Sequence, residues 1–344
     1  EQYAALAEME FINESEIDYL EKSIQIPILK KDLIKGEGII FPDVFEFKRS
    51  GKRGLNVKEI KELINEKYIL SENVEKTNPL RKENFKKAII GTIIAGRLKS
   101  SRLKRKALLK IGELTSIELC IKNCLNFRNT NYTILATSDN NEDNELKEFT
   151  YSKSVLFHTG HPEDVIKRYL SIIDEKDIDV IIRVTADMPF VSSEITDLLL
   201  KSHFESGADY TAARNVAVGT APEIINAKAL REVKKHFPNA EYSEYMTWYF
   251  QNNAEYFRIN IIDLPNSLIR DYRLTLDYQE DLELFNLIQN HLNKNKLDSN
   301  IKNIFNFMDS NPDSAKINSH LTLKYKTDEE LINRLNDQTK IREK

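Results

Sequence analysis

Two cysteines, Cys120 and Cys124, are all that this chain of 344 residues contains. They lie four positions apart in a stretch with helical periodicity, so they share one helix face, where backbone geometry disfavours a disulfide. The six histidines are scattered, and none is spaced to complete a metal site with the cysteines. We therefore expect two reduced residues on a buried face, which favours a reducing, cytoplasmic compartment.

Long apolar runs are also lacking. No run approaches the roughly 20 residues that cross a bilayer, and no signal peptide is recognisable, so we expect no membrane partner. A net charge of -4 disfavours bulk binding to nucleic acid. The 41% of hydrophobic and 30% of charged residues are typical of a soluble globular protein, and the length is sufficient for two domains.

The sequence changes in texture near residue 85. We expect a leading helix over 1–20, a β-rich module over 21–84, an α/β domain over 85–295 and a C-terminal tail over 296–344. In the α/β domain apolar strands alternate with amphipathic helices, which indicates a mostly parallel sheet with helices on both faces. The tail is interpreted either as a surface-wrapping segment or as an oligomer arm.

The boundaries of these expected elements are as follows. The α/β domain should have strands at 88–95, 132–136, 154–157, 180–184 and 272–277, and helices at 116–125, 162–173, 193–205, 227–236 and 279–292. The β-rich module should have strands at 24–29, 38–41 and 44–48 and a helix at 57–66, and the tail should end in a helix at 327–335.

Positive charge is concentrated at one turn of this acidic chain. The stretch "IIAGRLKSSRLKRKALLKI" (93–111) opens like a strand and closes with a helix-like pattern, and it carries seven basic residues within fourteen positions. Arginine and lysine at a strand-to-helix turn suit a triphosphate cradle, while a solvated basic helix start is the alternative. No Walker pattern occurs, which excludes a P-loop kinase or ATPase.

Two aspartates follow apolar stretches elsewhere. Asp187 in "VIIRVTADMPF" and Asp277 in "YRLTLDYQEDL" each come at a predicted strand end, where ligands of such sheets bind. Two carboxylates opposite a basic cradle suit a Mg²⁺ ion that bridges protein and phosphates. Each could instead cap the following helix, but the convergence of all three features favours a ligand site.

A further loop, "FHTGHPEDVIKRYL", lies before the helix expected at 162–173. Thr159 and Gly160 form its exposed part, and Arg168 either reaches the cleft or pairs with Asp164 at i,i+4. The flanking histidines are interpreted as ordinary loop residues.

Together these residues resemble the cytidylyltransferases of the sialic-acid and Kdo type, most closely the spore-coat-polysaccharide subgroup. The stretches that carry the resemblance are "IIAGRLKSSRLKRKAL", "ATSDNNED", "TGHPEDVIKRY", "RVTADMPFV" and "LTLDYQEDL", in the family's order across residues 86–295. Lys99 and the pair Lys104–Arg105 depart from the family's small residue and Pro-Gly. The segment "RNVAVGTAPEIINAKAL" keeps the family's Gly219 and Glu223 but is otherwise divergent.

The resemblance implies a Rossmann-like nucleotidyltransferase sandwich that transfers CMP from CTP to a 2-keto-3-deoxy acid sugar and releases pyrophosphate. It implies the following roles: catalysis by Arg97, Arg102 and Lys106; binding of CTP by Ala95, Ser100, Ser101, Thr137 and Ser138; contact with the acidic sugar by Thr159, Gly160, Arg168, Arg183 and Glu223; and binding of Mg²⁺ by Asp187 and Asp277. Such enzymes commonly pair, so we expect a homodimer, for which the aromatic "SEYMTWYF" is either an interface or a buried helix face.

The N-terminal module has a resemblance of its own. The stretch "KSIQIPILKKDLIKGEGIIFPDVFEFKRSGKRGL" is similar to the antifreeze-like SAF domain that ends sialic-acid synthases. Because the sequence also begins at Glu1 without a methionine, we expect that the natural polypeptide carries a synthase barrel upstream.

Two competing functions remain open. The same fold could activate a phosphorylated sugar or a phosphonate, or the chain could be a non-catalytic nucleotide-binding module that regulates a synthase. Pyrophosphate release from CTP with different acceptors distinguishes these possibilities.

Overall fold

A computed structural model describes Ser15, Tyr19 and residues 23–49, 52–100, 102–150 and 154–342, with only the backbone of 324 and 325. The chain divides into two compact units, residues 1–87 with 204–207 and residues 88–203 with 208–344. Of the helix expected over 1–20, only Ser15 and Tyr19 belong to the described residues. Of the SAF-like turn at 48–55, the described residues are 48, 49 and 52–55.

The first unit is built from short strands around a small apolar core. β1 (Ile26–Leu29) pairs antiparallel with β2 (Phe45–Lys48), and β3 (Tyr68–Leu70) pairs antiparallel with β4 (Phe85–Lys87). Helix α3 (Val57–Asn65) starts with a capping box and buries Ile60 and Ile64, which share a face because they are four residues apart. The strand expected at 38–41 is absent from these described residues: 38–40 have no regular structure, and a turn begins at the cis peptide Phe41–Pro42.

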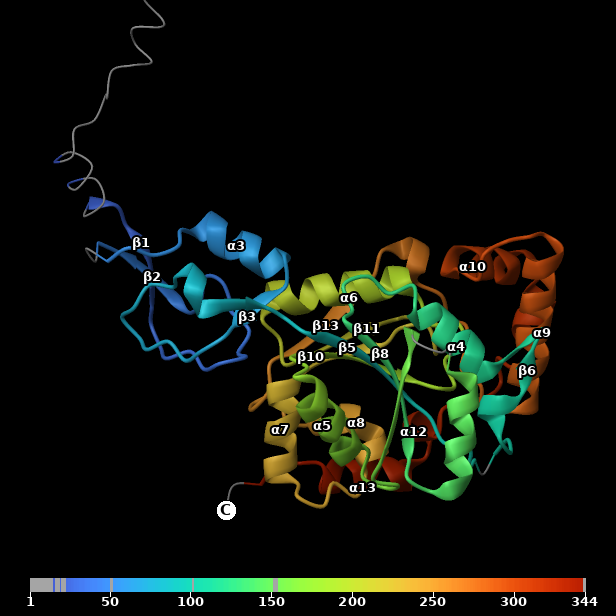
Figure 1. Ribbon diagram of the computed structural model, residues 1–344. Helices are drawn as coiled ribbons and strands as arrows, with labels where there is room; N and C mark the ends of the chain where they lie inside the picture. The colour runs from blue at the N-terminus through green and yellow to red at the C-terminus, as the bar shows by residue number, and fades with distance from the viewer. Residues whose placement is uncertain are drawn as a thin grey trace, which may run out of the picture. The chain divides into compact units, whose positions relative to one another are not determined.

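The second unit is organised around a mainly parallel sheet (Figure 1). Its described strands are β5 (Ile90–Ala95), β8 (Tyr132–Ser138), β9 (Leu156–Gly160), β10 (Val180–Thr185), β11 (Tyr210–Arg214), β12 (Glu223–Asn226) and β13 (Ile259–Asp263). They are ordered β13-β11-β12-β10-β5-β8-β9. Within the described sheet only β12 runs antiparallel to its neighbours. The expected α/β fold class is therefore confirmed.

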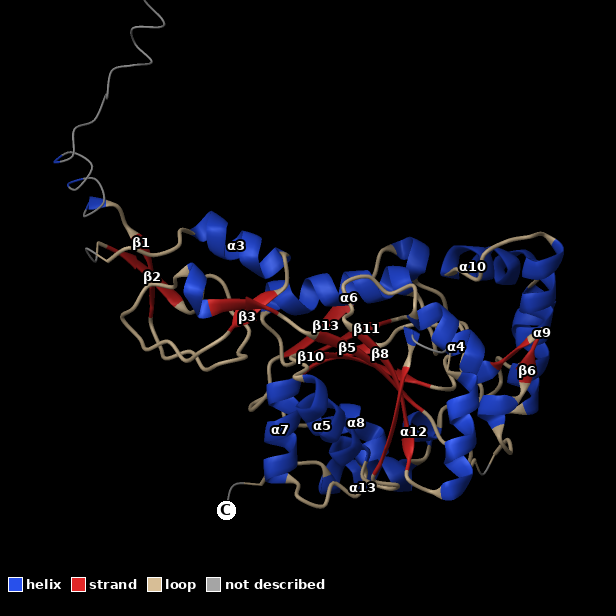
Figure 2. Cartoon of the chain, viewed as in Figure 1, coloured by secondary structure: helices blue, strands red, loops and turns tan. Residues whose placement is uncertain are grey.

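Helices cover both faces of this sheet (Figure 2). Helices α5 (Val165–Lys176), α7 (Ala227–His236) and α8 (Met246–Gln251) lie on one face, and α4 (Ser116–Cys124) and α6 (Ser193–Ser206) lie on the other. Because neither face meets water, strands such as "IGTIIA" are almost continuously apolar. Cys120 and Cys124 are buried and free, as expected.

The C-terminal part of the chain, from Gln279 onward, adds helices beside this core. They are α9 (Gln279–Lys294), α10 (Ile301–Ser310), α11 (Pro312–Lys316), α12 (Lys324–Thr327) and α13 (Glu329–Gln338). Buried Asn253 holds the end of the chain, because its Nδ2 donates to the carbonyl of Thr339 at 2.7 Å and its Oδ1 accepts from the N–H of Ile341 at 2.7 Å. Within the described residues, no helix combines the length and apolarity needed to cross a membrane.

Two expected elements of this unit are wrong. Residues 272–277 form no strand; only Arg273 makes an isolated bridge, to Val218. The stretch after the basic cluster is not an α-helix but a 3-10 turn (Lys106–Leu108) followed by a hairpin of β6 (Lys110–Ile111) and β7 (Leu114–Thr115). In both places the local pattern was apolar, but long-range pairing decides whether a short apolar segment joins a sheet.

Candidate active site

The sheet topology brings the basic loop and the first aspartate together. β5 and β10 are parallel neighbours in which Ala95 pairs with Thr185, so the loops that leave them begin side by side. The loop after β5 carries Arg102 and Lys106, and Asp187 follows β10 by two residues. These residues meet at the carboxyl edge of the sheet, and sheets of this architecture bind their ligands at that edge.

Lys106 lies at the centre of the cluster. Its Nζ is 2.7 Å from Oδ2 of Asp187 and 2.8 Å from Oδ1 of Asp277. Nη2 of Arg102 donates to the same Oδ1 of Asp277 at 2.7 Å. Two of the three predicted cationic residues, Arg102 and Lys106, therefore form one contiguous group with both predicted aspartates.

The opposite charges in this group stabilise each other's ionised form. Burial alone would lower the pKa of Lys106, but the carboxylates of Asp187 and Asp277 raise it above its ordinary value. Burial alone would raise the pKa of Asp187, but the Lys106 ammonium and the Thr185 hydroxyl, which donates to Oδ1 at 2.5 Å, hold it below its ordinary value. Lysine and aspartate are therefore both charged near neutral pH.

Asp277 does not extend a strand, yet its carboxylate is well fixed. It lies directly before Tyr278, the N-cap of α9, and Nη2 of Arg273 donates to its Oδ2 at 3.1 Å. The Asp281 carboxylate accepts from the backbone N–H of Asp277 at 2.8 Å. Arg273 and Asp281 did not emerge from the sequence, although the spacing of 273, 277 and 281 at four-residue intervals was a usable signal.

The remaining residues of the basic loop lie in different settings. Arg97 is partly exposed and pairs with Glu244 at 3.2 Å and with Glu163 at 3.8 Å. Ala95 is the last residue of β5, and Ser100 is half-buried in the loop. Ser101 lies outside the described residues.

The end of β8 supports this loop from a different side. Ser138 donates its hydroxyl to Asp143, and the other carboxylate oxygen of Asp143 accepts from the N–H of Leu98 at 2.6 Å. Thr137 is fully buried, and its hydroxyl has no hydrogen-bond partner among the described residues. Asp143, which sequence reasoning missed, thus ties β8 to the loop before Arg102.

Thr159 and Gly160 end β9 and pair in register with Thr137 and Ser138. Arg168 is buried behind this loop, and its guanidinium donates to the carbonyl of His161 at 2.7 Å and to that of Pro162 at 3.0 Å. It does not pair with Asp164, whose carboxylate meets Lys234. Burial lowers the pKa of Arg168.

Arg183 and Glu223 meet across β10 and β12. Their register pairs them, and they form a mostly buried ion pair. Glu223 also accepts hydrogen bonds from the hydroxyls of Tyr210, at 2.5 Å, and of Thr247. Burial alone would raise the pKa of Glu223, but Arg183 and these hydroxyls hold it below its ordinary value. Arg183 also donates to the carbonyl of Glu244 at 3.1 Å, which links this pair to Arg97.

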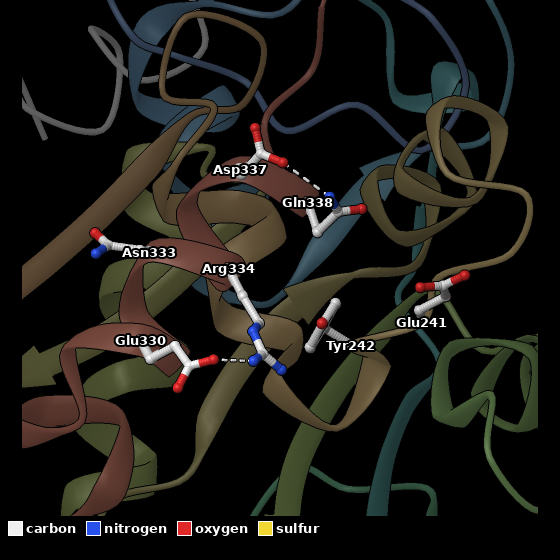
Figure 3. Close-up of a pocket in the computed structure, with 7 residues that line it drawn as sticks. All are labelled: Glu241, Tyr242, Glu330, Asn333, Arg334, Asp337 and Gln338. Atoms are coloured by element: carbon white, nitrogen blue, oxygen red, sulfur yellow. Dashed lines mark hydrogen bonds and ion pairs between the residues drawn. The ribbon is translucent and has the colours of Figure 1, made fainter.

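A separate groove lies beside helix α13 (Figure 3). It is lined by Glu241 and Tyr242 together with Glu330, Asn333, Arg334, Asp337 and Gln338. Its acidic groups on α13 have partners of their own: Glu330 bonds to Arg334, and Asp337 bonds to Gln338 and to Arg342. It contains none of the residues expected to act on a nucleotide.

A mostly parallel sheet whose carboxyl edge gathers cationic side chains around two aspartates defines a nucleotide-binding α/β enzyme. A family model described as cytidylyltransferase matches residues 92–304. The matched part includes all four residues of the cluster: Arg102, Lys106, Asp187 and Asp277. The chain therefore belongs to the cytidylyltransferase family and is a nucleotidyltransferase.

Individual relatives agree with this assignment. The chain is 32% identical to an uncharacterised protein of Methanocaldococcus jannaschii over 237 residues, which is 69% of this chain and 96% of that protein. It is 28% identical to the spore coat polysaccharide biosynthesis protein SpsF of Bacillus subtilis, over 65% of this chain and 95% of that protein. A cytidylyltransferase structure from Leptospira borgpetersenii superposes with a TM-score of 0.61 at 24% identity and covers 69% of this chain and 99% of that chain, a likeness of fold.

Proposed function

We propose that this chain transfers CMP from CTP to the anomeric hydroxyl of a 2-keto-3-deoxy acid sugar of the nonulosonic kind. The acceptor oxygen would form a bond to the α-phosphorus, and the bond to the β-phosphate would break to release pyrophosphate. One observation carries the proposal: Arg102 and Lys106 converge on Asp187 and Asp277 at the carboxyl edge of the sheet. Two cations in that place suit a leaving group that gains negative charge.

The donor set of the cluster fits a divalent cation. One oxygen of Asp187 and one of Asp277 lie within hydrogen-bond distance of a single nitrogen, so a cationic group already occupies the space between them. Among the described residues no group of three or more His, Cys, Asp or Glu side chains could hold a metal. Mg²⁺ commonly takes one or two carboxylates and completes its shell with nucleotide phosphates and water, so two are sufficient. When bound, Mg²⁺ supplies charge against the α-phosphate and lowers the pKa of an oxygen that it holds.

Binding of the triphosphate requires Lys106 to move. Among the described lysines, only Lys106 bridges the carboxylates of Asp187 and Asp277 with its ammonium group. The phosphates of CTP would give this ammonium an alternative anionic partner. We propose that Lys106 and Arg102 transfer their hydrogen bonds from Asp277 to the β- and γ-phosphates. Arg97, with Ser100, Ser101, Thr137, Ser138 and the backbone at Ala95, would complete the CTP side.

The acceptor would lie beside Arg183 and Glu223. Arg97 connects this pair with the loop after Thr159 and Gly160, because it contacts both Glu163 and Glu244. The guanidinium of Arg168 is committed to two loop carbonyls, so we propose that it shapes the loop which faces the acceptor. An acidic acceptor is supported by a further relative, a 3-deoxy-manno-octulosonate cytidylyltransferase of Rickettsia akari, 32% identical over 30% of this chain and 42% of that protein.

The remaining expectations are carried forward as parts of this proposal. Residues 21–84 would form a SAF-like module of a synthase fusion, the chain would pair as a homodimer, and it would work in the cytoplasm. The half-buried Trp248 would contribute to this pairing, whereas Tyr249 is buried in the core. Light scattering after size exclusion measures the oligomeric state.

A turnover screen tests the proposed activity. CTP and Mg²⁺ are incubated with the enzyme and a panel of nonulosonic acids, octulosonic acids, sugar phosphates and phosphonates, and pyrophosphate is measured. We expect release only with the keto-acid sugars. Release with the phosphorylated acceptors alone would replace this proposal with the competing one, and CTP binding without any release would favour the regulatory module.

A further inference from the structure

The segment that presents Asp277 has no strand to hold it. Residues 272–277 lie outside the sheet. The carbonyl of Tyr272 and the N–H of Leu274 bond to Val218, and the N–H of Leu276 bonds to the carbonyl of Asp187, but none of these backbone bonds involves Asp277 itself. The segment is nevertheless deeply buried: Arg273 is 7% exposed, Asp277 4% and Asp281 0%. A buried loop that carries a ligand residue needs another source of rigidity.

Asp281 supplies one part of that rigidity. Its Oδ2 accepts from the backbone N–H groups of Asp277 and Tyr278, at 2.8 and 2.9 Å, and from Nη2 of Arg273 at 3.1 Å. Its Oδ1 accepts from Nε of Arg273 at 2.8 Å. Because Nη2 of Arg273 also donates to Oδ2 of Asp277, one oxygen of Asp277 is held and the other faces Lys106.

Asn318 closes this arrangement from the C-terminal segment. It is 1% exposed, and its Nδ2 donates to the carbonyl of Arg273 at 3.0 Å and to Oδ1 of Asp281 at 2.8 Å. An amide nitrogen has two protons, so one side chain joins the start and the end of the stretch whose middle residue is Asp277. Asn318 lies beyond residues 92–304, the part that matches the family.

We propose that Asn318 is a positioning residue for the metal-binding carboxylate of Asp277 and acts through Asp281 and Arg273. The inference rests on the proposed function, because it takes Asp277 as a metal ligand. A partner of this kind orients a ligand without touching the metal, and its loss commonly reduces metal affinity or activity about tenfold or more. The C-terminal segment thereby contributes to the site as well as to stability.

The test separates the contribution of the metal to the affinity for CTP from the other contributions to that affinity. The affinity of the full chain for CTP is measured by calorimetry without acceptor, once with Mn²⁺ and once with EDTA, and the ratio of the two affinities is the metal-dependent part. We expect Asn318→Ala to reduce this ratio about tenfold. It should also lower kcat, while the affinity for CTP in EDTA stays near the wild-type value, because the triphosphate contacts of Arg102 and Lys106 do not depend on the metal.

Asn253→Ala is the matched control. Asn253 is also a buried amide that ties the C-terminal segment to the core, but its bonds go to the carbonyls of Tyr249 and Thr339 and to the N–H of Ile341. We expect this variant to lose a comparable amount of thermal stability and to keep the wild-type ratio. Where Asn318→Ala does not fold, Asn318→Ser, which retains one donor, replaces it, and we expect an intermediate ratio.

Two further results separate the possible failures. Asp277→Ala should bring the ratio close to one; if it does not, the metal assignment in the proposed function fails. If Asp277→Ala behaves as expected but the Asn318 variant matches Asn253→Ala in ratio and kcat, Asn318 is merely structural and the inference is overturned.

Discussion

Lys106 and Asp187 are 81 positions apart in the sequence, and their side chains form an ion pair of 2.7 Å at the carboxyl edge of the sheet. The ammonium thereby lies where we assign the metal. Under the proposed assignment, metal and lysine would compete for the same carboxylates in the absence of nucleotide, and the triphosphate would end this competition by giving the lysine a different partner.

Removal of the ammonium should therefore expose the metal site. We expect Lys106→Gln to bind Mn²⁺ on the order of tenfold more tightly than the wild type in the absence of CTP, because a charge this close shifts such equilibria by a unit or more. Turnover should fall on the order of a hundredfold, because the leaving pyrophosphate loses a cation. Calorimetry and pyrophosphate release measure the two effects. Lys104→Gln, a change at an exposed lysine of the same loop, should alter neither, and an unchanged Mn²⁺ affinity in Lys106→Gln would contradict the competition.

Asp187→Asn tests the other side of this pair. The substitution keeps the shape but removes the charge, so we expect kcat to fall by roughly a thousandfold, the effect of several kcal/mol of lost metal stabilisation. The circular dichroism spectrum should stay the same, because asparagine has nearly the size and shape of the aspartate, whose side chain is 22% exposed. Near-native turnover in this variant would remove Asp187 from the metal site.

Asp143 should affect CTP binding from a distance. Asp143→Ala leaves the N–H of Leu98 and the hydroxyl of Ser138 without their partner, which costs about 2 kcal/mol of unfolding free energy. Because Leu98 precedes the Arg102 loop, we expect the KM for CTP to rise about tenfold, the equivalent of about 1.4 kcal/mol. Urea denaturation and steady-state kinetics measure these quantities. The exposed Asp139 of the same segment provides the control, and equal kinetics in Asp139→Ala and Asp143→Ala would contradict the role of Asp143.

Glu223→Gln should separate the acceptor from the nucleotide. It leaves the buried guanidinium of Arg183 without its carboxylate, which we expect to cost about 3 kcal/mol of stability. The KM for the acceptor sugar should rise while the KM for CTP stays the same. Asp174→Asn breaks an exposed pair with Arg231 and should cost less than about 1 kcal/mol, with no kinetic effect. A rise in the KM for CTP alone would place Glu223 on the nucleotide side.

His203 gives the stability a specific pH dependence. Burial, assisted by Arg258, lowers the pKa of His203 to about 3, while Nδ1 shares a hydrogen bond of 2.9 Å with Thr211. Between about pH 6.5, the ordinary value in an unfolded chain, and pH 3, the unfolded state takes up a proton that the folded state does not. The unfolding free energy should therefore fall with decreasing pH, by up to about 1.4 kcal/mol per pH unit from this group. Denaturation series from pH 7 to pH 4 should show a smaller slope in His203→Gln, and an identical slope would contradict the assignment.

The sequence was most informative where a residue's surroundings are local. The continuous apolar runs of β5 and β10 predicted buried parallel strands, and Asp187 followed from its place after one of them. The apolar stretch before Asp277 had the same appearance, yet it forms only an isolated bridge, from Arg273 to Val218, which lies outside the strands of the sheet. Whether such a segment becomes a strand depends on which neighbour is free to pair with it, and that is not a local property.

Side-chain partners were harder to predict than strands. Asp143 bonds to Leu98 across 45 positions, and Asn318 bonds to Asp281 across 37, so no spacing in the sequence connects them. Arg168 showed the converse: its helical position allowed either a place in the cleft or a pair with Asp164, but its buried guanidinium donates to loop carbonyls. Such contacts follow from the packing of whole elements.

The reversed direction of β12 has a consequence for how this enzyme can diversify. A parallel strand reaches the ligand edge with its last residue, whereas β12 reaches it with its first, Glu223. The connection that precedes Glu223, residues 215–222, is anchored at Gly219, whose φ of +90° and close approach to Leu274 exclude a larger side chain. Changes of length or composition between that anchor and Glu223 would remodel the surroundings of the Arg183 pair while the loops that carry Arg102, Lys106 and Asp187 stay as they are. If the acceptor binds beside Arg183 and Glu223 as proposed, a change in this one short connection would accommodate a new acceptor without a change in the loops that we assign to the triphosphate.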